Sequence, residues 1–478
     1  MSSVIRRTTT LGVSIAVMTI VSACDIFSPQ DNQQSTKQRV IVEIPENIGG
    51  ANAVANTTTN AFSLPSASMP LTERLNFSVG NSFFRNPWVT APSSTTARDG
   101  LGPYFNTNAC QNCHIKDGRG HLPASDDDNH VSLLVRLSIG PSSDPKHSVL
   151  THPILGEQLQ DMAIPGLEPE AKLSFKYQYQ TQTLSGDEKV ELRKPIAVIE
   201  NTIYDAPLDN LQTSVRIAPA MIGLGYLAAL SNEQILANAD PDDLDKDGIS
   251  GKANTVWNLA TQSQDLGRFG WKAGQPNLKQ QNASAFSGDM GLTSSIVAHD
   301  DCTQSQTDCT SAINGGSPEV SDKILDRVTF YTANLAVPLR RINDETTITA
   351  GAEIFQTIGC ADCHKVSWQT PEVPDMPWLS NQTIYPFTDL LLHDMGEGLA
   401  DHRSEFNASG TEWRTAPLWG IGLTSTVNSE FGFLHDGRAR NLTEAIVWHG
   451  GEAQTSQQAF VNLPANERKQ LLAFLNSL

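Results

Sequence analysis

The sequence predicts a mainly α fold that contains two domains of one kind, with a β-rich insertion in the first. The pentad Cys-x-x-Cys-His occurs twice, as Cys110–His114 and Cys360–His364, in a chain with only seven cysteines. From residue 131 to 139 apolar side chains fall at every second position, which is typical of a strand. Pro464 opens a closing segment whose leucines at 471, 472, 475 and 478 share one helix face.

Each pentad is the attachment signature of a c-type haem. The two thiols bond the former vinyl groups of the porphyrin, and the adjacent histidine binds the iron. Zinc is the alternative, but it needs no histidine directly after a thiol pair. The surroundings also repeat, because Phe105 and Phe355 each stand five residues before the first cysteine. The sequence therefore predicts two covalently bound haem c groups, with attachment through Cys110, Cys113, Cys360 and Cys363 and iron ligation by His114 and His364.

The N-terminus predicts export. Arg6 and Arg7 precede an apolar run from Leu11 to Val21, which ends in Ser-Ala-Cys24. This is typical of a bacterial signal peptide, and the last residues resemble a lipoprotein box. The run is short for a membrane-spanning helix. Residues 1–24 are therefore expected to be a lipoprotein signal peptide, with a lipid anchor at Cys24 on the periplasmic side of a bacterial membrane, inner or outer.

The remaining boundaries follow from composition. Residues 25–70 are rich in Asn, Gln, Thr and Ser, which predicts a flexible tether. An N-terminal haem domain is expected over 71–345, with the β-rich insertion at 131–216. A C-terminal cytochrome c domain is expected over 346–478. Together these segments give the predicted fold class, which is mainly α with two cytochrome c-type haem domains.

Charge and cysteine content limit the partners. The formal net charge of -19 argues against nucleic acid and favours a small basic redox donor protein. Cys302 and Cys309 are left after the pentads and Cys24, and in an oxidising compartment they are expected to form a disulfide.

An acidic loop predicts a cation site. Asp243, Asp245 and Asp247 alternate ahead of Gly248, as carboxylates do in loops that bind calcium. The twelfth position of such a loop is Glu in an EF-hand and Asn254 here. Calcium and a solvated acidic turn therefore both stay open.

Several further stretches resemble the bacterial dihaem oxidoreductase family, whose members are described as peroxidases or as thiol oxidoreductases. The resemblance runs from about Leu101 to the C-terminus. The similar stretches are Asp247-Gly-Ile-Ser-Gly251, Gly267-Arg-Phe-Gly-Trp-Lys272, Asp289-Met-Gly291, Leu390-Leu-Leu-His-Asp-Met-Gly396, Glu412-Trp-Arg414, His435-Asp-Gly-Arg-Ala-Arg440 and Trp448-His-Gly-Gly-Glu452.

A more distant resemblance concerns the dihaem cytochrome c peroxidases and the tryptophan-tryptophylquinone maturation enzymes. In these, a His-Asp-Gly turn precedes the sixth ligand of the C-terminal haem by fourteen residues. The turn here is His435-Asp-Gly437, and fourteen residues after its histidine stands His449. The resemblance implies that His449 ligates the second iron, with His435 orienting it. His393 and Met395 are the alternative ligands.

The same resemblance implies residues for the first site. Trp271 and Asp289, followed by Met290, resemble a tryptophan between the haems and an acid–base group that moves a proton on bound peroxide. Ordinary core packing is the alternative for Trp271. The peroxidases place a distal histidine where this chain has Lys246; His130 could replace it, but an open first iron fits better.

These observations lead us to expect an exported dihaem c-type oxidoreductase of peroxidase type. Electrons would pass from the C-terminal haem to an open N-terminal haem, where peroxide or another small substrate reacts. Two other readings stay open. One is a dihaem electron-transfer lipoprotein without a substrate of its own. The other is a partner-binding lipoprotein that handles metal or haem.

Overall fold

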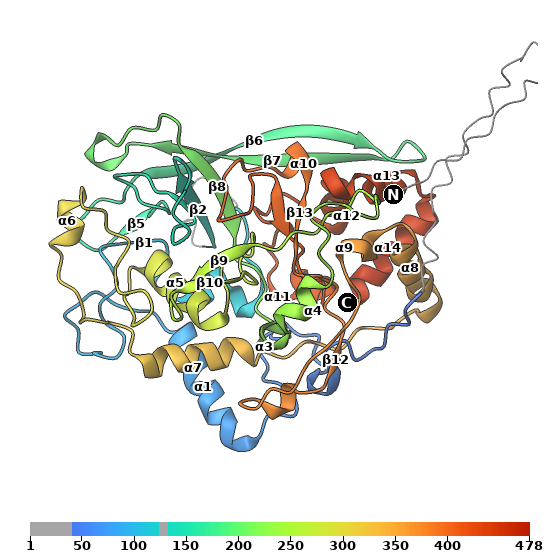
Figure 1. Ribbon diagram of the computed structural model, residues 1–478, viewed down its shortest axis with the longest axis horizontal. Helices are drawn as coiled ribbons and strands as arrows, with labels where there is room; N and C mark the ends of the chain where they lie inside the picture. Colours follow the sequence, from blue (N-terminus) through green and yellow to red (C-terminus); the bar gives the residue numbers. More distant parts are fainter. Residues whose placement is uncertain (1–40, 124–131) are drawn as a thin grey trace, which may run out of the picture. The chain divides into compact units, whose positions relative to one another are not determined.

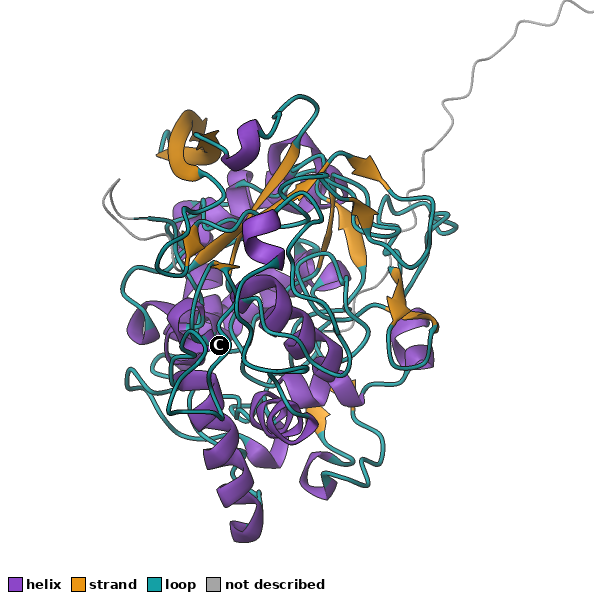
Figure 2. Cartoon of the chain, turned by 90° about the vertical axis from the view of Figure 1, so that its left-hand side faces the viewer, coloured by secondary structure: helices purple, strands orange, loops and turns teal. Residues whose placement is uncertain are grey.

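The computed structural model describes residues 41–123 and 132–478. The signal peptide, Cys24 and His130 lie outside the described residues. Helices and short strands are interspersed among long loops (Figures 1 and 2). The helices are α1 (Leu71–Arg85), α2 (Cys110–Cys113), α3 (Leu224–Ala229), α4 (Asn232–Leu236), α5 (Leu278–Met290), α6 (Thr307–Thr310), α7 (Asp322–Ala333), α8 (Glu345–Thr357), α9 (Cys360–Cys363), α10 (Gly396–Leu399), α11 (Thr424–Val427), α12 (Leu442–Val447), α13 (Gln454–Asn462) and α14 (Ala465–Ser477).

The strands of the described residues all form two-stranded antiparallel sheets. They are β1 (Tyr104–Phe105), β2 (Leu133–Ser138), β3 (Gly140–Pro141), β4 (Val149–Leu150), β5 (Met162–Ala163), β6 (Lys172–Thr183), β7 (Lys189–Glu200), β8 (Gln212–Ile217), β9 (Thr255–Asn258), β10 (Ser263–Leu266), β11 (Trp368–Gln369), β12 (Thr383–Ile384), β13 (Leu392–Asp394) and β14 (Glu412–Arg414).

The predicted mainly α class is wrong. The chain is 30% helical and 19% strand, and the strands form many small sheets. Strands β2 to β8 fall in or beside the predicted β-rich stretch, but β9 to β14 lie outside it. Several of these strands have only two or three residues, which is too short for a repeat of period two to appear in the sequence. Each pairs with its neighbour along the chain, β9 with β10, β11 with β12 and β13 with β14.

Each pentad helix is supported by a pair of longer helices. Helix α1 contacts α7 and α2, and α8 contacts α14 and α9. A glycine permits the close approach in each pair. A Cβ atom at Gly80 of α1 would lie 2.1 Å from the carbonyl oxygen of Arg327, and one at Gly351 of α8 would lie 2.0 Å from that of Gln470. The two pentads therefore have similar local supports.

An aromatic ring from each helix pair faces a pentad histidine. Phe84 of α1 lies with its ring centroid 6.0 Å from that of His114, and Phe355 of α8 lies 6.3 Å from His364. The sequence repeat instead matches Phe105 with Phe355. Phe105 packs in the cluster around α1, α5 and α7, and it does not line the cavity beside His114.

The long β6–β7 hairpin reaches the C-terminal helices (Figure 1). Its strands pair over twelve residues each, from Lys172 opposite Glu200 to Thr183 opposite Lys189. Strand β7 contacts α12. At the tip, Arg468 of α14 lies 2.6 Å from the carboxylate of Glu188. The hairpin therefore connects the middle of the sequence to its last helices.

Residues 41–70 are part of the folded body, so the predicted tether is wrong for this part of its range. Ile48 and Phe62 are 0% and 1% exposed. The Asn52 side-chain amide donates to the Tyr226 hydroxyl at 2.7 Å. The polar composition of this segment does not reveal its few buried apolar residues. The asparagine can be buried because its side chain is hydrogen-bonded within the protein. The rest of the tether, residues 25–40, lies outside the described residues.

Residues 41–478 form a single unit. It contains a smaller hydrophobic cluster around α1, α5 and α7 and a larger one that includes α8 and α14. The boundary expected between residues 345 and 346 stays a prediction. No helix of the described residues combines the length and apolar character needed to cross a membrane.

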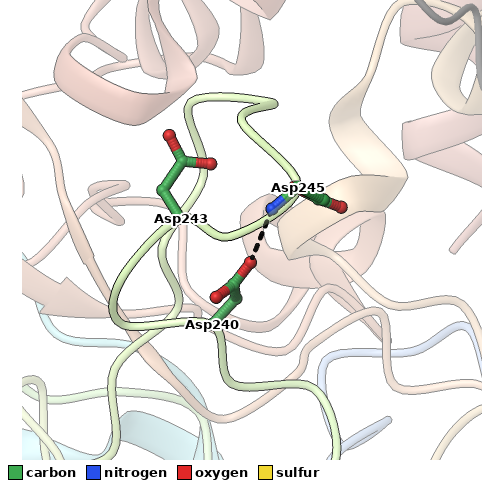
Figure 3. A group of neighbouring side chains, drawn as sticks. All are labelled: Asp240, Asp243 and Asp245. Atoms are coloured by element: carbon green, nitrogen blue, oxygen red, sulfur yellow. Dashed lines mark hydrogen bonds between the residues drawn. The ribbon is translucent and has the colours of Figure 1, made fainter. Parts of the chain in front are cut away.

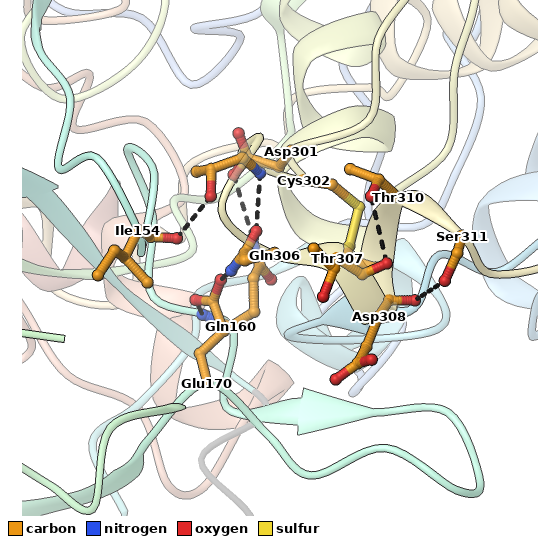
Figure 4. Close-up of a disulfide and its surroundings, with 12 residues drawn as sticks. Ile154, Gln160, Glu170, Asp301, Cys302, Gln306, Thr307, Asp308, Thr310 and Ser311 are labelled. Atoms are coloured by element: carbon orange, nitrogen blue, oxygen red, sulfur yellow. Dashed lines mark hydrogen bonds between the residues drawn. A yellow bond between two sulfur atoms is a disulfide. The ribbon is translucent and has the colours of Figure 1, made fainter. Parts of the chain in front are cut away.

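The predicted disulfide between Cys302 and Cys309 is confirmed, and it closes a loop beside α6 (Figure 4). Gln306 in this loop donates its side-chain amide to Glu170. The backbone amide of Gln160 donates to the same carboxyl at 2.7 Å. Burial raises the pKa of Glu170 to about 8. The disulfide loop is thus attached to a buried carboxyl group rather than to solvent-exposed chain.

Candidate functional site

The first pentad lies at the wall of a large cavity, which we call the first cavity. It measures about 550 Å³ and is lined by Cys110, Cys113 and His114. His114 Nδ1 lies 2.8 Å from the carbonyl oxygen of Pro219. Because a carbonyl only accepts, Nδ1 carries the proton and Nε2 carries the lone pair. Burial lowers the pKa of His114 to about 4, so the imidazole is neutral at physiological pH. It is in the form that binds a metal.

Asp289 is a buried carboxyl group on the wall of the first cavity, at the end of α5. Its Oδ1 accepts a hydrogen bond from Gln158 Nε2 at 2.9 Å. Its backbone oxygen accepts from the amides of Asn106 and Thr107, which fixes α5 to the segment before the pentad. Burial raises the pKa of Asp289, while Arg136 and Gln158 act in the opposite direction. The group can therefore hold a proton inside the cavity at a higher pH than an exposed carboxyl.

The first cavity reaches the surface. Lys146 and His147, which are both exposed, are among its lining residues. Met221 and Met290 also line it and are thioether candidates for the iron. Lys246 is exposed and lines neither cavity.

The second pentad borders a smaller space of about 190 Å³, which we call the second cavity. It contains two histidines in the same chemical state. His364 Nδ1 lies 2.8 Å from the Phe387 carbonyl oxygen, and His449 Nδ1 lies 2.7 Å from that of Ala445. Both Nε2 atoms therefore carry a lone pair. Burial lowers the pKa of His364 to about 4, and the nearby His449 adds to this. Burial also lowers the pKa of His449.

The walls of the two cavities differ in how exposed their residues are. None of the described residues that line it is classed as exposed. The structure therefore gives the two pentads unequal surroundings. The first cavity has exposed residues in its wall, whereas the second is lined by four histidines, of which His364 and His449 have a free Nε2.

His393 lines the second cavity but has no free nitrogen. Its Nε2 lies 2.8 Å from Asp389 Oδ2, and its Nδ1 lies 2.7 Å from Glu452 Oε2. Burial opposes a proton on this ring, but the bonds to Asp389, Cys363 and Glu452 hold its pKa well above the usual value. An imidazolium has no lone pair for a metal. The geometry favours His449 over His393, whereas Met395 lines the cavity as a remaining alternative.

His435 packs face to face with Trp413, an arrangement that the sequence did not predict. The ring centroids are 3.6 Å apart with 10° between the planes. Burial lowers the pKa of His435 to about 3. Both rings line the second cavity. The Lys272 ammonium lies 4.3 Å from the centroid of the Trp413 ring, as a cation over an aromatic ring.

Trp271 forms part of the wall that both cavities share. Its Nε1 donates to the carbonyl oxygen of Ile217 at 2.9 Å. The Arg119 guanidinium lies 5.3 Å from the centroid of its ring. This placement agrees with the expected position between the two sites. A role in electron transfer stays a prediction.

Paired charges lie beside the first cavity. Arg216 is 2.7 Å from Glu405, and Lys272 is 2.9 Å from Asp401. Arg403 is 3.0 Å from Glu157. Such buried charges are stable only with partners. The pairs fix the polar wall of the cavity.

The residues at both sites fit a c-type haem. Each cavity combines two thiols, a neutral imidazole with a free Nε2 and apolar walls. Burial raises the pKa of Cys110 to about 12, so its thiol is uncharged. Zinc would require four ligands in one place. The described residues bring no group of three or more cysteines and histidines together as metal ligands.

Comparisons with known proteins agree with this chemistry. The model of the family described as "Di-haem oxidoreductase, putative peroxidase" matches residues 44–139 and 154–478. The chain belongs to this family. Membership supports haem as the cofactor and a dihaem oxidoreductase as the class of protein.

Other comparisons add little. No curated protein matches the chain. A solved structure of hydrazine synthase from Kuenenia stuttgartiensis, pressurized with xenon, is similar at 14% identity with a TM-score of 0.31. That alignment covers 92% of this chain and 99% of the other.

The acidic loop brings together Asp240, Asp243 and Asp245, with one oxygen from each within 4.8 Å of the others (Figure 3). Asp247, which the sequence predicted as a ligand, is not in this group. Its Oδ1 accepts the backbone amide of Ile249 at 3.0 Å. Asp240 also bonds the loop backbone, since its Oδ2 accepts the amide of Leu244 at 2.8 Å. Calcium binding stays a prediction.

If the loop binds calcium, removing the ion should lower the melting temperature, because three carboxylates would then repel one another. Asp243→Asn should have the same effect and abolish the response to chelator. Asp247→Asn is the matched control and should keep it. Calorimetric scans with and without a calcium chelator measure this. A melting temperature that is indifferent to both calcium and chelator would leave the loop as a solvated turn.

Proposed function

We propose that this dihaem oxidoreductase is an exported c-type enzyme that acts on peroxide or another small substrate. Its haems would be bonded to the cysteines of the two pentads, with His114 and His364 as iron ligands. Electrons would enter at the C-terminal haem and reach an open N-terminal haem. The bound haems would supply the redox chemistry, while the protein supplies orientation and charge.

The observation that carries this proposal is the difference between the two cavities. The second cavity holds His364 and His449, each with a free Nε2, and no exposed described residue lines it. In the first cavity, His114 has the same form, but exposed Lys146 and His147 contribute to the wall. A site with two imidazoles that can both bind the iron suits electron storage, and a site with exposed residues in its wall suits a substrate.

Two side chains have roles in the proposal. Asp289 holds and transfers a proton in the first cavity, supported by its hydrogen bond from Gln158. Trp271 fills the shared wall and offers an aromatic ring between the two sites. His435 and Trp413 pack together and shape the second cavity around His449.

Export and partners belong to the same proposal. A lipoprotein signal peptide ending at Cys24 would place the protein on the periplasmic side of a bacterial membrane. The disulfide between Cys302 and Cys309 supports an oxidising compartment. The net charge of -19 supports a small basic redox protein as the electron donor and argues against nucleic acid.

One observation favours a second function, electron transfer without a substrate. Met221 and Met290 both line the first cavity. A thioether from either one would close the first iron, and the protein would then be a lipid-anchored dihaem carrier.

Covalent attachment tests the foundation of the proposal. Protein that is matured with a cytochrome c assembly system should carry two added haem masses. A Cys110→Ala, Cys113→Ala variant should lose one, and a Cys360→Ala, Cys363→Ala variant should lose the other. Whole-protein mass spectrometry measures this after unfolding. A wild-type protein with zinc, or with haem that dissociates on unfolding, would contradict the proposal.

The sixth ligand of the second haem is tested with paired variants. His449→Ala should convert a low-spin haem to high-spin or water-bound, because its Nε2 is the free donor. His393→Ala is the control, and it should leave the spin state unchanged because neither of its nitrogens is free. Ferric electron paramagnetic resonance spectra report the result. If only His393→Ala changes the signal, the assignment is wrong.

Asp289→Asn should slow peroxide turnover roughly 10²–10⁴-fold if its carboxyl moves the proton. The amide can keep the hydrogen-bonded position, so both haem spectra should stay as in the wild type. Asp301→Asn is the matched control, since Asp301 is another carboxyl that lines the first cavity. Burial raises the pKa of Asp301 to about 7. Steady-state rates with a reduced donor measure the change. Equal losses in the two variants would remove the specific role of Asp289.

A further inference from the structure

Arg119 is a buried cation without a carboxylate partner among the described residues. It is 8% exposed and lines both cavities. Its Nε and Nη2 donate to the carbonyl oxygens of Gly432 and Leu434 at 3.0 and 2.9 Å. Burial lowers its pKa to about 10, with no charged group contributing. Nη1 has no hydrogen bond within the described chain.

Arg414, at the end of β14, is half-buried and likewise has no carboxylate partner among the described residues. It also lines both cavities. Its Nε donates to the Gly270 carbonyl oxygen at 2.9 Å and its Nη1 to that of Thr415 at 3.2 Å. Burial lowers its pKa to about 10, and Asp389 opposes this without forming an ion pair. Its Nη2 has no hydrogen bond within the described chain.

Both arginines are attached to Trp271. The guanidinium of Arg119 lies over its ring, and the backbone amide of Arg414 donates to its carbonyl oxygen at 2.9 Å. The two cations therefore lie on the wall between the cavities. The other buried cations nearby, Arg216 and Lys272, each have a carboxylate within 2.9 Å.

A buried guanidinium without a counter-charge is unfavourable, so these two need an anion from outside the chain. Backbone carbonyls accept hydrogen bonds from the two guanidinium groups but do not neutralise their positive charge. The anion must be one that reaches the wall from within the cavities. A carboxylate matches the planar fork of arginine. Haem fits this requirement, because it fills an apolar cavity and carries two propionate carboxylates.

We propose that Arg119 and Arg414 bind haem propionates at the wall that the two cavities share. This inference rests on the proposed haem sites. A cation beside a propionate stabilises the reduced haem, which has one positive charge less at the iron. Removing the cation should therefore lower the midpoint potential. Because both arginines line both cavities, the wall adjusts the two potentials from a single place.

The test compares Arg119→Gln and Arg414→Gln with the wild type in the full protein. Each variant should keep two covalent haems, shift the propionate bending band in resonance Raman spectra and lower the midpoint potential of at least one haem. Arg119→Lys keeps the charge and should lower the potential less than Arg119→Gln. If the Arg119→Gln variant does not fold, the Arg119→Lys variant still tests the contact with the propionate.

Arg268→Gln is the matched control. Arg268 is 9% exposed and also donates to a backbone carbonyl, that of Leu227 at 3.3 Å, but it lines neither cavity. It should leave the bands and both potentials unchanged.

The outcomes distinguish a failure of the proposed function from a failure of the propionate assignment. If the wild type carries no covalent haem, the proposed function fails first. If it carries two haems and the Arg119 and Arg414 variants leave the propionate bands and potentials unmoved, only the propionate assignment is overturned. The same holds if an effect appears only after an organic acid is added, because the anion would then be a free carboxylate.

Discussion

The candidate sites depend on one type of hydrogen bond, from a histidine Nδ1 to a backbone carbonyl. His114, His364 and His449 each make it, to Pro219, Phe387 and Ala445. The bond fixes the tautomer and leaves Nε2 free. The fold has to hold these carbonyls in place. The helix pairs α1–α7 and α8–α14 support the pentads themselves, whereas the carbonyls of Pro219 and Phe387 lie in loops and that of Ala445 lies in α12.

The two sites share local supports but differ in their surroundings. Each has a pentad helix, a pair of longer helices and a phenylalanine beside the histidine. The first cavity is larger, polar at Asp289 and lined in part by exposed residues, whereas the second is lined by four histidines, among them His364 and His449. Trp271 belongs to both walls. The structure is therefore suited to unequal roles for two similar groups that share one wall.

The sequence predicted the chemistry better than the architecture. The pentads and the disulfide could be inferred because each is a short-range pattern of reactive side chains, whereas His449 was reached only through the resemblance to the dihaem cytochrome c peroxidases. The sequence indicated no role for Arg119, since the carbonyls of Gly432 and Leu434 that accept its hydrogen bonds come from far along the chain. Trp413 had no assigned role for the same reason. The mainly α prediction failed because strands of two or three residues are too short for a repeat of period two to appear in the sequence.

The central claim is that one iron is open and the other is closed by two imidazoles. The electron paramagnetic resonance spectrum of the ferric wild-type protein tests this most directly, recorded before and after cyanide is added. The account predicts one high-spin and one low-spin haem, with cyanide converting only the high-spin signal. A spectrum that is wholly low-spin and unchanged by cyanide would contradict it. Met221 or Met290 would then be the candidate that closes the first iron.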